Sequence, residues 1–145
     1  MTVARILKSK PSSTVLTISP ASTMADAAEV LADKGIGALV VSHDGMTLSG
    51  ILSERDIVRQ VSGQGAECLT HRIEAAMTKS VKTISPKATA VEALQVMTNG
   101  RFRHLPVMED DEMIGVISIG DVVKYRIAEM QHENEALTEM IVGHG

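Results

Sequence analysis

Hydrophobic and polar residues follow one pattern twice along the chain of 145 residues. In each copy a short extended segment ends at a proline, because Pro20 and Pro86 disfavour helical backbone in the residue before them. Apolar residues then recur at helical spacing, which predicts a helix with one buried face. These residues are Met24, Ala27, Ala28, Leu31 and Ala32 in the first copy, and Val91, Leu94 and Met97 in the second.

Two apolar runs follow each predicted helix and indicate a pair of buried strands. They cover residues 38–41 and 48–52 in the first copy, and residues 105–108 and 113–117 in the second. Turn-forming residues separate the runs, at His43–Gly45 and at Glu109–Asp111. Each second run leads into a Ser-x-x-Asp segment, which is typical of a helix start. The order strand, helix, strand, strand, helix therefore occurs twice, and the fold class is α/β (α+β).

The two copies also align in sequence, which indicates an internal repeat. Residues 17–44 align with residues 83–110 at a constant offset of 66, including the whole Thr-Ile-Ser-Pro run. After one residue of slippage, residues 50–59 align with residues 115–124 at an offset of 65. We therefore divide the chain into an N-terminal segment (1–10), a first repeat (11–62), a linker with a short connector helix (63–76), a second repeat (77–126) and a C-terminal helix with its tail (127–145). Within the linker, residues 63–72 are polar and Gly-containing, and we expect them to be mobile.

A long final helix with one apolar stripe is predicted beyond the second repeat. Its stripe alternates spacings of four and three residues, as in a coiled coil: Val123, Ile127, Met130, Asn134, Leu137 and Ile141. The stripe either packs on its own chain or pairs with a second copy, in which case Asn134 suits a dimer register.

Composition excludes several classes of function. Phe102 and Tyr125 are the only aromatic residues and the net charge is −4, so nucleic acid is a poor partner. Cys68 is the only cysteine, which excludes an internal disulfide and fits a partly exposed, unremarkable thiol in a reducing compartment. The chain has neither a secretory signal nor 18 consecutive apolar residues. We therefore expect a cytoplasmic protein with no membrane insertion.

Catalytic and metal motifs are absent from the sequence. The five histidines show no metal-binding spacing, so we expect surface histidines and no metal site. No phosphate-loop motif for nucleotide hydrolysis occurs, and no acid–base pair or activated nucleophile is visible. A binding module is therefore favoured over an enzyme.

The two Gly-φ-φ-Ser-x-x-Asp segments, at 50–56 and 115–121, resemble those of a tandem pair of cystathionine-β-synthase (CBS) domains, called a Bateman module. The Thr-Ile-Ser-Pro runs and the Ala-Met-Thr connector at 76–78 fit the same family. This resemblance implies two repeats packed about a pseudo-twofold axis, and commonly a homodimer. It also implies a regulatory adenosine ligand between the repeats (AMP, ADP, ATP, NAD(H) or S-adenosylmethionine) and a regulated partner protein, here unknown.

The Ser-x-x-Asp residues suit such a ligand chemically. One carboxylate can accept hydrogen bonds from both ribose hydroxyls, which suits Asp56 and Asp121. Hydroxyls and free N–H groups at a helix N-terminus can receive phosphate, which suits Ser53 and Ser118. The alternative is that both segments are helix caps without a ligand, and that the protein is a structural or adaptor dimer working through its C-terminal helix.

The resemblance implies two unequal clefts. Asp56 is expected to face the other repeat at Thr78, Val81, Arg103 and His104, with Arg55 beside it as a donor fork for phosphate. Asp121 is expected to face Gly37, Ala38 and the Lys10-Pro11 segment, where Ile119 and Gly120 replace Glu54 and Arg55. We therefore expect occupancy at Asp56 first. The Asp121 site then has three alternatives: it binds weakly, it binds a different part of a longer ligand, or it stays empty. Glu54 is expected to disfavour highly charged polyphosphates at Asp56.

Overall fold

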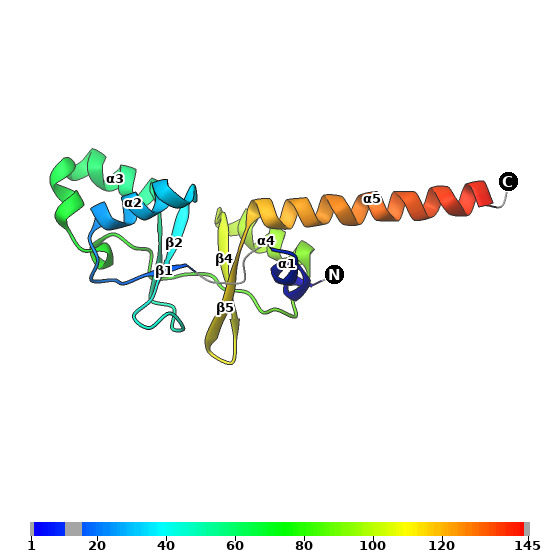
Figure 1. Cartoon of the computed structure of the whole chain (residues 1–145), viewed down its shortest axis with the longest axis horizontal. Coiled ribbons are helices and arrows are strands. Elements are labelled where there is room, and N and C mark those ends of the chain that lie inside the picture. The colour runs from blue at the N-terminus through cyan, green and yellow to red at the C-terminus, as the bar shows by residue number, and fades with distance from the viewer. Residues whose placement is uncertain (1, 11–15, 144–145) are drawn as a thin grey trace.

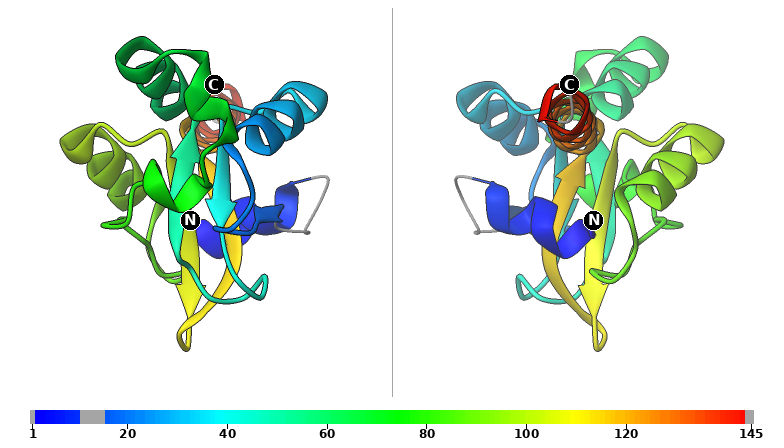
Figure 2. Two further views of the ribbon diagram at one scale, coloured as in Figure 1. Left: turned by 90° about the vertical axis from the view of Figure 1, so that its left-hand side faces the viewer. Right: turned by 90° about the vertical axis from the view of Figure 1, so that its right-hand side faces the viewer.

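The computed structural model describes residues 2–10 and 16–143, so Pro11 and His144 lie outside the described residues. The elements follow the predicted order, except that an isolated bridge at Ile84 replaces the first strand predicted for the second repeat. A long C-terminal helix projects from the body (Figure 1). Viewed along the long axis, the helices of both repeats lie around the outside of the central strands (Figure 2).

The first repeat begins with a short strand and contains two helices and a three-stranded sheet. Its elements are β1 (Thr17–Ile18), α2 (Met24–Lys34), β2 (Ala38–Val41), β3 (Gly50–Ser53) and α3 (Glu54–Gln64). Strand β2 pairs in parallel with β1 and antiparallel with β3. Helix α2 ends at Gly35, whose φ of 62° is the left-handed conformation that glycine favours at a helix end.

The second repeat has the same plan. Its elements are α4 (Ala90–Gly100), β4 (His104–Glu109), β5 (Glu112–Ser118) and α5 (Ile119–Gly143). Strands β4 and β5 are antiparallel, and Ile84 forms a parallel bridge to Val107 in place of a first strand. In the first repeat Ile18 pairs with Val41, so the two pairs are related by the offset of 66 found in the sequence.

The slippage between the two offsets lies in the strand connections. A turn at Asp110 and Asp111 joins β4 to β5, and both residues have positive φ (51° and 64°), as two-residue hairpin turns of type I′ require. In the first repeat, residues 42–49 connect β2 to β3. The shorter second connection and the register shift between Val107 and Met108 account for the change in offset.

Each repeat has its own hydrophobic core. The first core consists of Met24, Ala27, Leu31, Leu39, Val41, Leu52, Ile57 and Ile73. The second consists of Val3, Ile6, Ile84, Ala90, Ala93, Met97, Leu105, Val107, Ile117 and Val122. Val3 and Ile6 belong to α1 (Val3–Ser9), so the N-terminal helix completes the core of the repeat that is distant from it in sequence.

The buried face predicted for the helix of the second repeat is partly wrong. Ala90, Ala93 and Met97 are buried, whereas Val91 is exposed. Thr89 caps this helix by accepting a hydrogen bond from the Glu92 N–H, and the cap orients the helix as in the first repeat. The buried positions therefore correspond to Met24, Ala27 and Leu31 at the offset of 66.

The linker, for which we expected a polar and mobile segment, contains regular helical structure, and its mobility stays a prediction. Helix α3 continues to Gln64, and two 3-10 helices follow, η1 (Ala66–Thr70) and η2 (Ile73–Ala75). Helix η1 packs against α2 and α3, and this packing buries Cys68 almost completely. The expected partly exposed thiol is therefore wrong.

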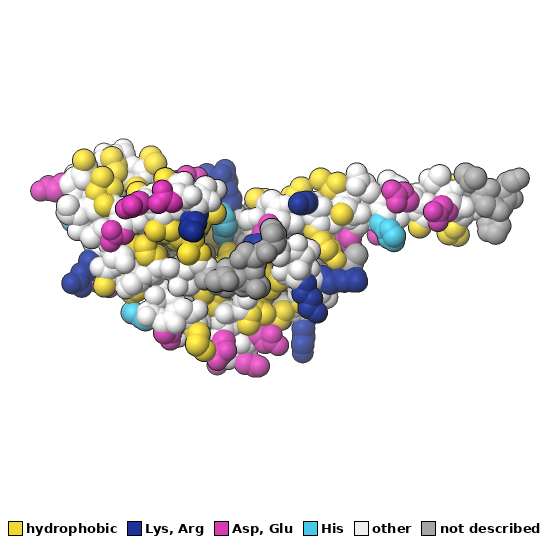
Figure 3. Space-filling model, in the orientation of Figure 1, with side chains coloured by type: hydrophobic (Ala, Val, Ile, Leu, Met, Phe, Trp, Pro, Cys, Tyr) yellow, Lys and Arg dark blue, Asp and Glu magenta, His cyan; other side chains and the backbone are white. Residues whose placement is uncertain are grey.

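Helix α5 runs without interruption from the second Ser-x-x-Asp segment to Gly143. Its first turns pack on the second repeat, where Val122 is buried. Farther along, hydrophobic side chains lie exposed among charged ones (Figure 3). Ile127 and Leu137 of the predicted stripe are 51% and 56% exposed, so the stripe does not pack against the described part of its own chain.

Candidate functional site

Both Ser-x-x-Asp segments form reciprocal helix caps. The Ser53 hydroxyl accepts from the Asp56 N–H at 3.1 Å, and the Asp56 carboxylate accepts from the Ser53 N–H at 2.9 Å. Ser118 and Asp121 make the same pair of bonds at 3.0 and 2.9 Å. Each cap uses only one carboxylate oxygen, Oδ2, so capping and ligand binding at the same aspartate are compatible.

A cleft of about 770 Å³ lies beside Asp56, between the repeats. The structure brings together in its lining the predicted residues Ser53, Arg55, Asp56, Thr78, Val81, Arg103 and His104. Thr78 reaches the cleft because its backbone pairs with Ile51 of β3, with N–H···O distances of 2.8 and 3.0 Å. The connector between the repeats is thereby attached to the first sheet beside the cap.

A second cleft of about 630 Å³ lies beside Asp121. Its lining includes the predicted residues Ser118, Asp121 and Ala38, together with Gly37 and Lys10. The Lys10 Nζ donates to the Val116 carbonyl at 2.8 Å and lies 3.0 Å from Asp121 Oδ2. Burial opposes ionisation of Asp121, but the Ser118 N–H and the Lys10 ammonium outweigh it and hold the pKa of this carboxyl below its usual value.

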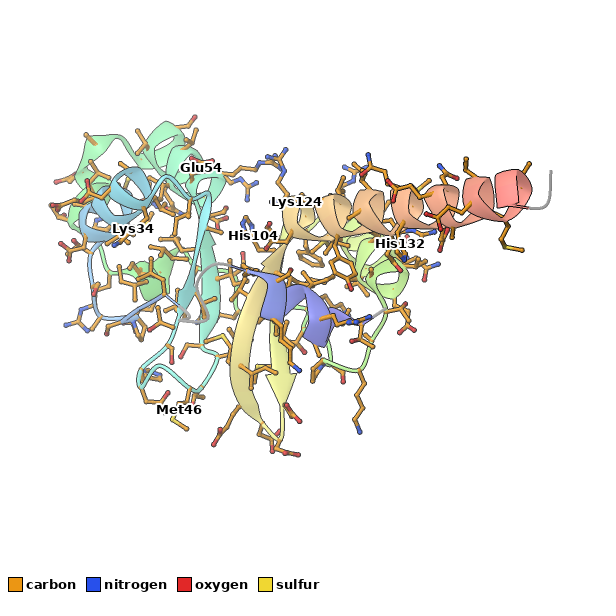
Figure 4. The ribbon with its side chains drawn as sticks, turned by 45° about the vertical axis from the view of Figure 1, so that its right-hand side comes forward. Lys34, Met46, Glu54, His104, Lys124 and His132 are labelled. Atoms are coloured by element: carbon orange, nitrogen blue, oxygen red, sulfur yellow. The ribbon has the colours of Figure 1, made fainter. Side chains whose placement is uncertain are left out.

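The two clefts share a wall made of Gly37, Ala38 and His104. Ala38 and His104 are equivalent positions of the two repeats, and they pair with Ser53 and Ser118 respectively in the two sheets. Figure 4 shows His104 in the region between the repeats. A Cβ on Gly37 would lie 3.2 Å from a Glu54 carboxylate oxygen and 3.9 Å from the His104 ring, so glycine leaves room for both side chains.

His104 corrects the expectation that the histidines are surface groups. Its side chain is half-buried, whereas His43, His71 and His132 are exposed. Burial lowers the pKa of His104, and the charges of Lys10 and Arg103 add to this effect against the opposing charge of Asp121. The imidazole in the shared wall therefore favours its neutral form.

Sequence reasoning missed several residues of the Asp56 cleft, notably Arg59, Arg101 and Phe102. Arg59 could have been found from its spacing, because it follows Asp56 by three residues on α3 and its Nη1 lies 3.9 Å from Asp56 Oδ1. Phe102 folds over Gly100, in the space that a Cβ on this glycine would occupy. With Arg55 and Arg103, the cleft has four arginines against Glu54 and Asp56, which favours an anionic ligand.

Residues 2–10 and 16–143 contain neither a candidate metal site nor a candidate membrane span. No cluster of three or more His, Cys, Asp or Glu side chains in these residues could hold a metal ion. No helix among them is long and apolar enough to cross a membrane.

Comparison with known proteins identifies the family. The model of the CBS domain matches the chain twice, at residues 3–63 and 73–128. The chain belongs to the CBS-domain family. The tandem CBS pair recognised from the sequence is thus confirmed, together with its α/β fold class. CBS domains are generally non-catalytic regulatory modules, and no enzyme family is indicated.

The chain spans different shares of the length of its relatives. CBSX3 of Arabidopsis thaliana, a mitochondrial CBS domain-containing protein, is 36% identical over 98% of this chain and 72% of its own length. CBSCBSPB1 of the same plant is 34% identical, but the chain spans only 24% of it.

Solved structures of similar proteins share the fold closely. ATU1752 of Agrobacterium tumefaciens, a CBS-domain protein, is 41% identical with a TM-score of 0.82, over 87% of this chain and 99% of that one. A protein with CBS domains from Burkholderia ambifaria is 43% identical with the same TM-score, over 88% of this chain and 95% of that one.

Proposed function

We propose that this CBS pair is a non-catalytic regulatory module that binds an adenosine-containing ligand in the Asp56 cleft and signals to a partner protein by conformational change. The candidate ligands are AMP, ADP, ATP, NAD(H) and S-adenosylmethionine. One observation carries the proposal: the cleft joins the capped start of α3 in the first repeat to Thr78, Val81 and His104. Its volume of about 770 Å³ lies within the range of small-molecule sites, roughly 300–1,000 Å³.

Each part of a nucleotide has a chemically suitable counterpart in this cleft. The cap engages Asp56 Oδ2, and the other oxygen of this carboxylate can accept from the ribose hydroxyls. Arg55 and Arg103 supply planar donor forks for phosphate. Val81 and Phe102 offer apolar surface for a base. Glu54 lies in the same lining, and its charge favours ligands with few phosphates over polyphosphates.

Proteins of the same fold carry such ligands. CBSX2, at 24% identity and a TM-score of 0.74, has been solved in complex with AMP. The CBS domain pair of MJ0100, at 21% identity and a TM-score of 0.75, has been solved with 5′-methylthioadenosine and S-adenosylmethionine. These complexes support the proposal, because proteins of this fold can bind an adenosine-type ligand.

The proposed signal follows from the separate cores of the two repeats. Each repeat has its own core, and the cleft lies between the two repeats. A ligand that contacts both sides of the cleft can therefore change the orientation of one repeat relative to the other. The ligand can shift this arrangement only as far as its affinities for the two arrangements differ.

A thermal-shift panel with the five ligand types tests the proposal. A ligand present at 100 times its dissociation constant stabilises the folded state by about 2.7 kcal/mol, which is readily measured. We expect Asp56→Ala to abolish the shift. Asp26→Ala is the matched control, because Asp26 forms the same reciprocal cap with Thr23 on α2 but lines neither cleft. Loss of the shift in both variants, or in neither, contradicts a role for Asp56 in ligand binding.

The homodimer belongs to the same proposal, and the exposed stripe on α5 supports it. Apolar side chains such as Ile127 and Leu137 are more than half exposed on this helix. A CBS-CP12 protein that is 26% identical over 85% of this chain has been described as a hexamer. Sedimentation of the wild type and Leu137→Glu tests the homodimer: we expect the wild type to sediment as a dimer and the variant as a monomer.

The same stripe keeps the adaptor dimer as a second candidate function. An adaptor would dimerise through α5 but show no thermal shift with any of the five ligand types.

The cellular compartment of the protein can also be tested. We propose the cytoplasm, and fractionation decides between it and an organelle such as the one named for CBSX3.

A further inference from the structure

Lys10 contacts two acceptor atoms beside the Asp121 cleft. Its Nζ lies 3.0 Å from Asp121 Oδ2, which also accepts the capping bond from the Ser118 N–H. The same ammonium donates to the Val116 carbonyl at 2.8 Å. The side chain of Lys10 is only 30% exposed, so the packing of the cleft holds the ammonium in place.

The equivalent aspartate of the first repeat has no such partner among the described residues. The nearest cation is the Arg59 guanidinium, at 3.9 Å from Asp56 Oδ1, and the side chain of Arg59 is 72% exposed. A contact of that length and exposure contributes little and is easily exchanged for a ligand. Asp56 and Asp121 therefore have the same cap but different cationic neighbours: an exposed arginine at Asp56 and a half-buried lysine at Asp121.

Helix α1, which packs on the second repeat, positions Lys10 beside Asp121. Lys10 directly follows α1 as its C-cap residue, and its backbone N–H donates to the Leu7 carbonyl. Val3 and Ile6 of the same helix are buried in the core of the second repeat. Leu7 lies against Gly115 of β5, where an added Cβ would come within 2.6 Å of its side chain. The ammonium therefore comes from an ordered element and not from a free chain end.

We infer that Lys10 is a built-in competitor that closes the Asp121 cleft to adenosine ligands, so that the module takes one such ligand per chain, at Asp56. The inference rests on the proposed function. A ribose that binds Asp121 through Oδ1, the carboxylate oxygen that neither the cap nor the Lys10 contact uses, has to fit beside the Lys10 ammonium on Oδ2. Moving this ammonium aside breaks a charge-assisted hydrogen bond to Asp121 and leaves the Val116 carbonyl without its donor. No corresponding contact has to be broken at Asp56.

Calorimetric titration with AMP tests the inference in Lys10→Met, which removes the ammonium and keeps an unbranched side chain. Lys8→Met is the matched control, because Lys8 lies on the same helix with an exposed side chain. We expect one AMP per chain for the wild type and Lys8→Met, and two for Lys10→Met. The expected gain in affinity at the second cleft is about tenfold or more, equivalent to about 1.4 kcal/mol.

Titrations in the Asp56→Ala background show whether the second AMP molecule binds in the Asp121 cleft. Asp56→Ala alone is expected to bind no AMP, whereas the double variant with Lys10→Met is expected to bind one per chain. Lys10→Gln serves as a second variant if the thermal midpoint of Lys10→Met falls below that of Lys8→Met.

The outcomes separate the inference from the proposed function. Two ligands per wild-type chain, or one ligand in both Lys10 variants, overturns the inference while adenosine binding stands. Weaker total binding after the loss of Lys10 also overturns it, because Lys10 would then hold the ligand. Absence of AMP binding in every variant overturns the inference and AMP as the ligand together.

Discussion

Gly50 offers a sharp test of how the cleft wall is built. A Cβ at this position would lie 2.7 Å from the Thr78 carbonyl oxygen and 2.9 Å from the Met77 sulfur. The carbonyl cannot move freely, because it accepts from the Ile51 N–H at 3.0 Å. Gly50→Ala therefore forces apart β3 and the connector that carries Thr78 into the Asp56 cleft.

Overpacking of this kind typically costs about 1–3 kcal/mol. A glycine-to-alanine change also reduces the entropy of the unfolded chain, which returns about 0.4–1 kcal/mol. The two effects together predict a loss of about 1–2 kcal/mol in the free energy of unfolding, measured by urea titration with circular dichroism. We also expect weaker AMP binding, because Thr78 lines the cleft.

Gly115→Ala is the matched control, since Gly115 is the equivalent position of the second repeat. The three atoms nearest to its Cβ all belong to the Leu7 side chain, which is flexible, whereas Gly50 faces the Thr78 backbone carbonyl. We expect a cost below about 1 kcal/mol and unchanged binding at Asp56. An equal or larger loss of stability in Gly115→Ala than in Gly50→Ala would refute the reasoning.

Three further predictions concern stability and accessibility. Gly63 lies within α3 with nothing near its Cβ position, so Gly63→Ala should raise the free energy of unfolding by about 0.5–1 kcal/mol in the same urea titration; a decrease contradicts it. Because the pKa of His104 is lowered in the folded state, the unfolded chain binds a proton first as the pH falls below about 6.5, and the fold loses stability there. His104→Gln should reduce the loss between pH 7.5 and 5.5, unlike the exposed control His71→Gln. Cys68 should react with a thiol reagent only slowly until urea unfolds the chain; fast native labelling contradicts its burial.

The repeated pattern predicted most of the fold because local signals agreed with one another. Capping residues begin α2, α3 and α4, and glycines end α2 and α3. The constant offset transfers the register from one repeat to the other, as Ile18 with Val41 and Ile84 with Val107 show. The burial of Val91 was predicted wrongly, because periodicity alone does not distinguish two adjacent helix faces. The equivalence of Ala90, Ala93 and Met97 with Met24, Ala27 and Leu31 of the first repeat identifies the buried face.

Features that depend on packing between distant segments could not be predicted. Cys68 lies among polar neighbours in sequence, and only the packing of η1 on α2 and α3 buries it. Lys10 was expected near the Asp121 cleft, but its bonds to Asp121 and Val116 depend on where α1 packs. The resemblance placed His104 opposite Asp56, but its partial burial and its position in the walls of both clefts depend on how the two repeats pack together.

A crystal structure of the protein grown with AMP tests the central claim most directly. We expect AMP in the Asp56 cleft, with its ribose hydroxyls donating to the Asp56 carboxylate and its phosphate near Arg55 or Arg103. The Lys10 contact with Asp121 should remain in place. AMP in the Asp121 cleft with the Asp56 cleft empty would contradict the account.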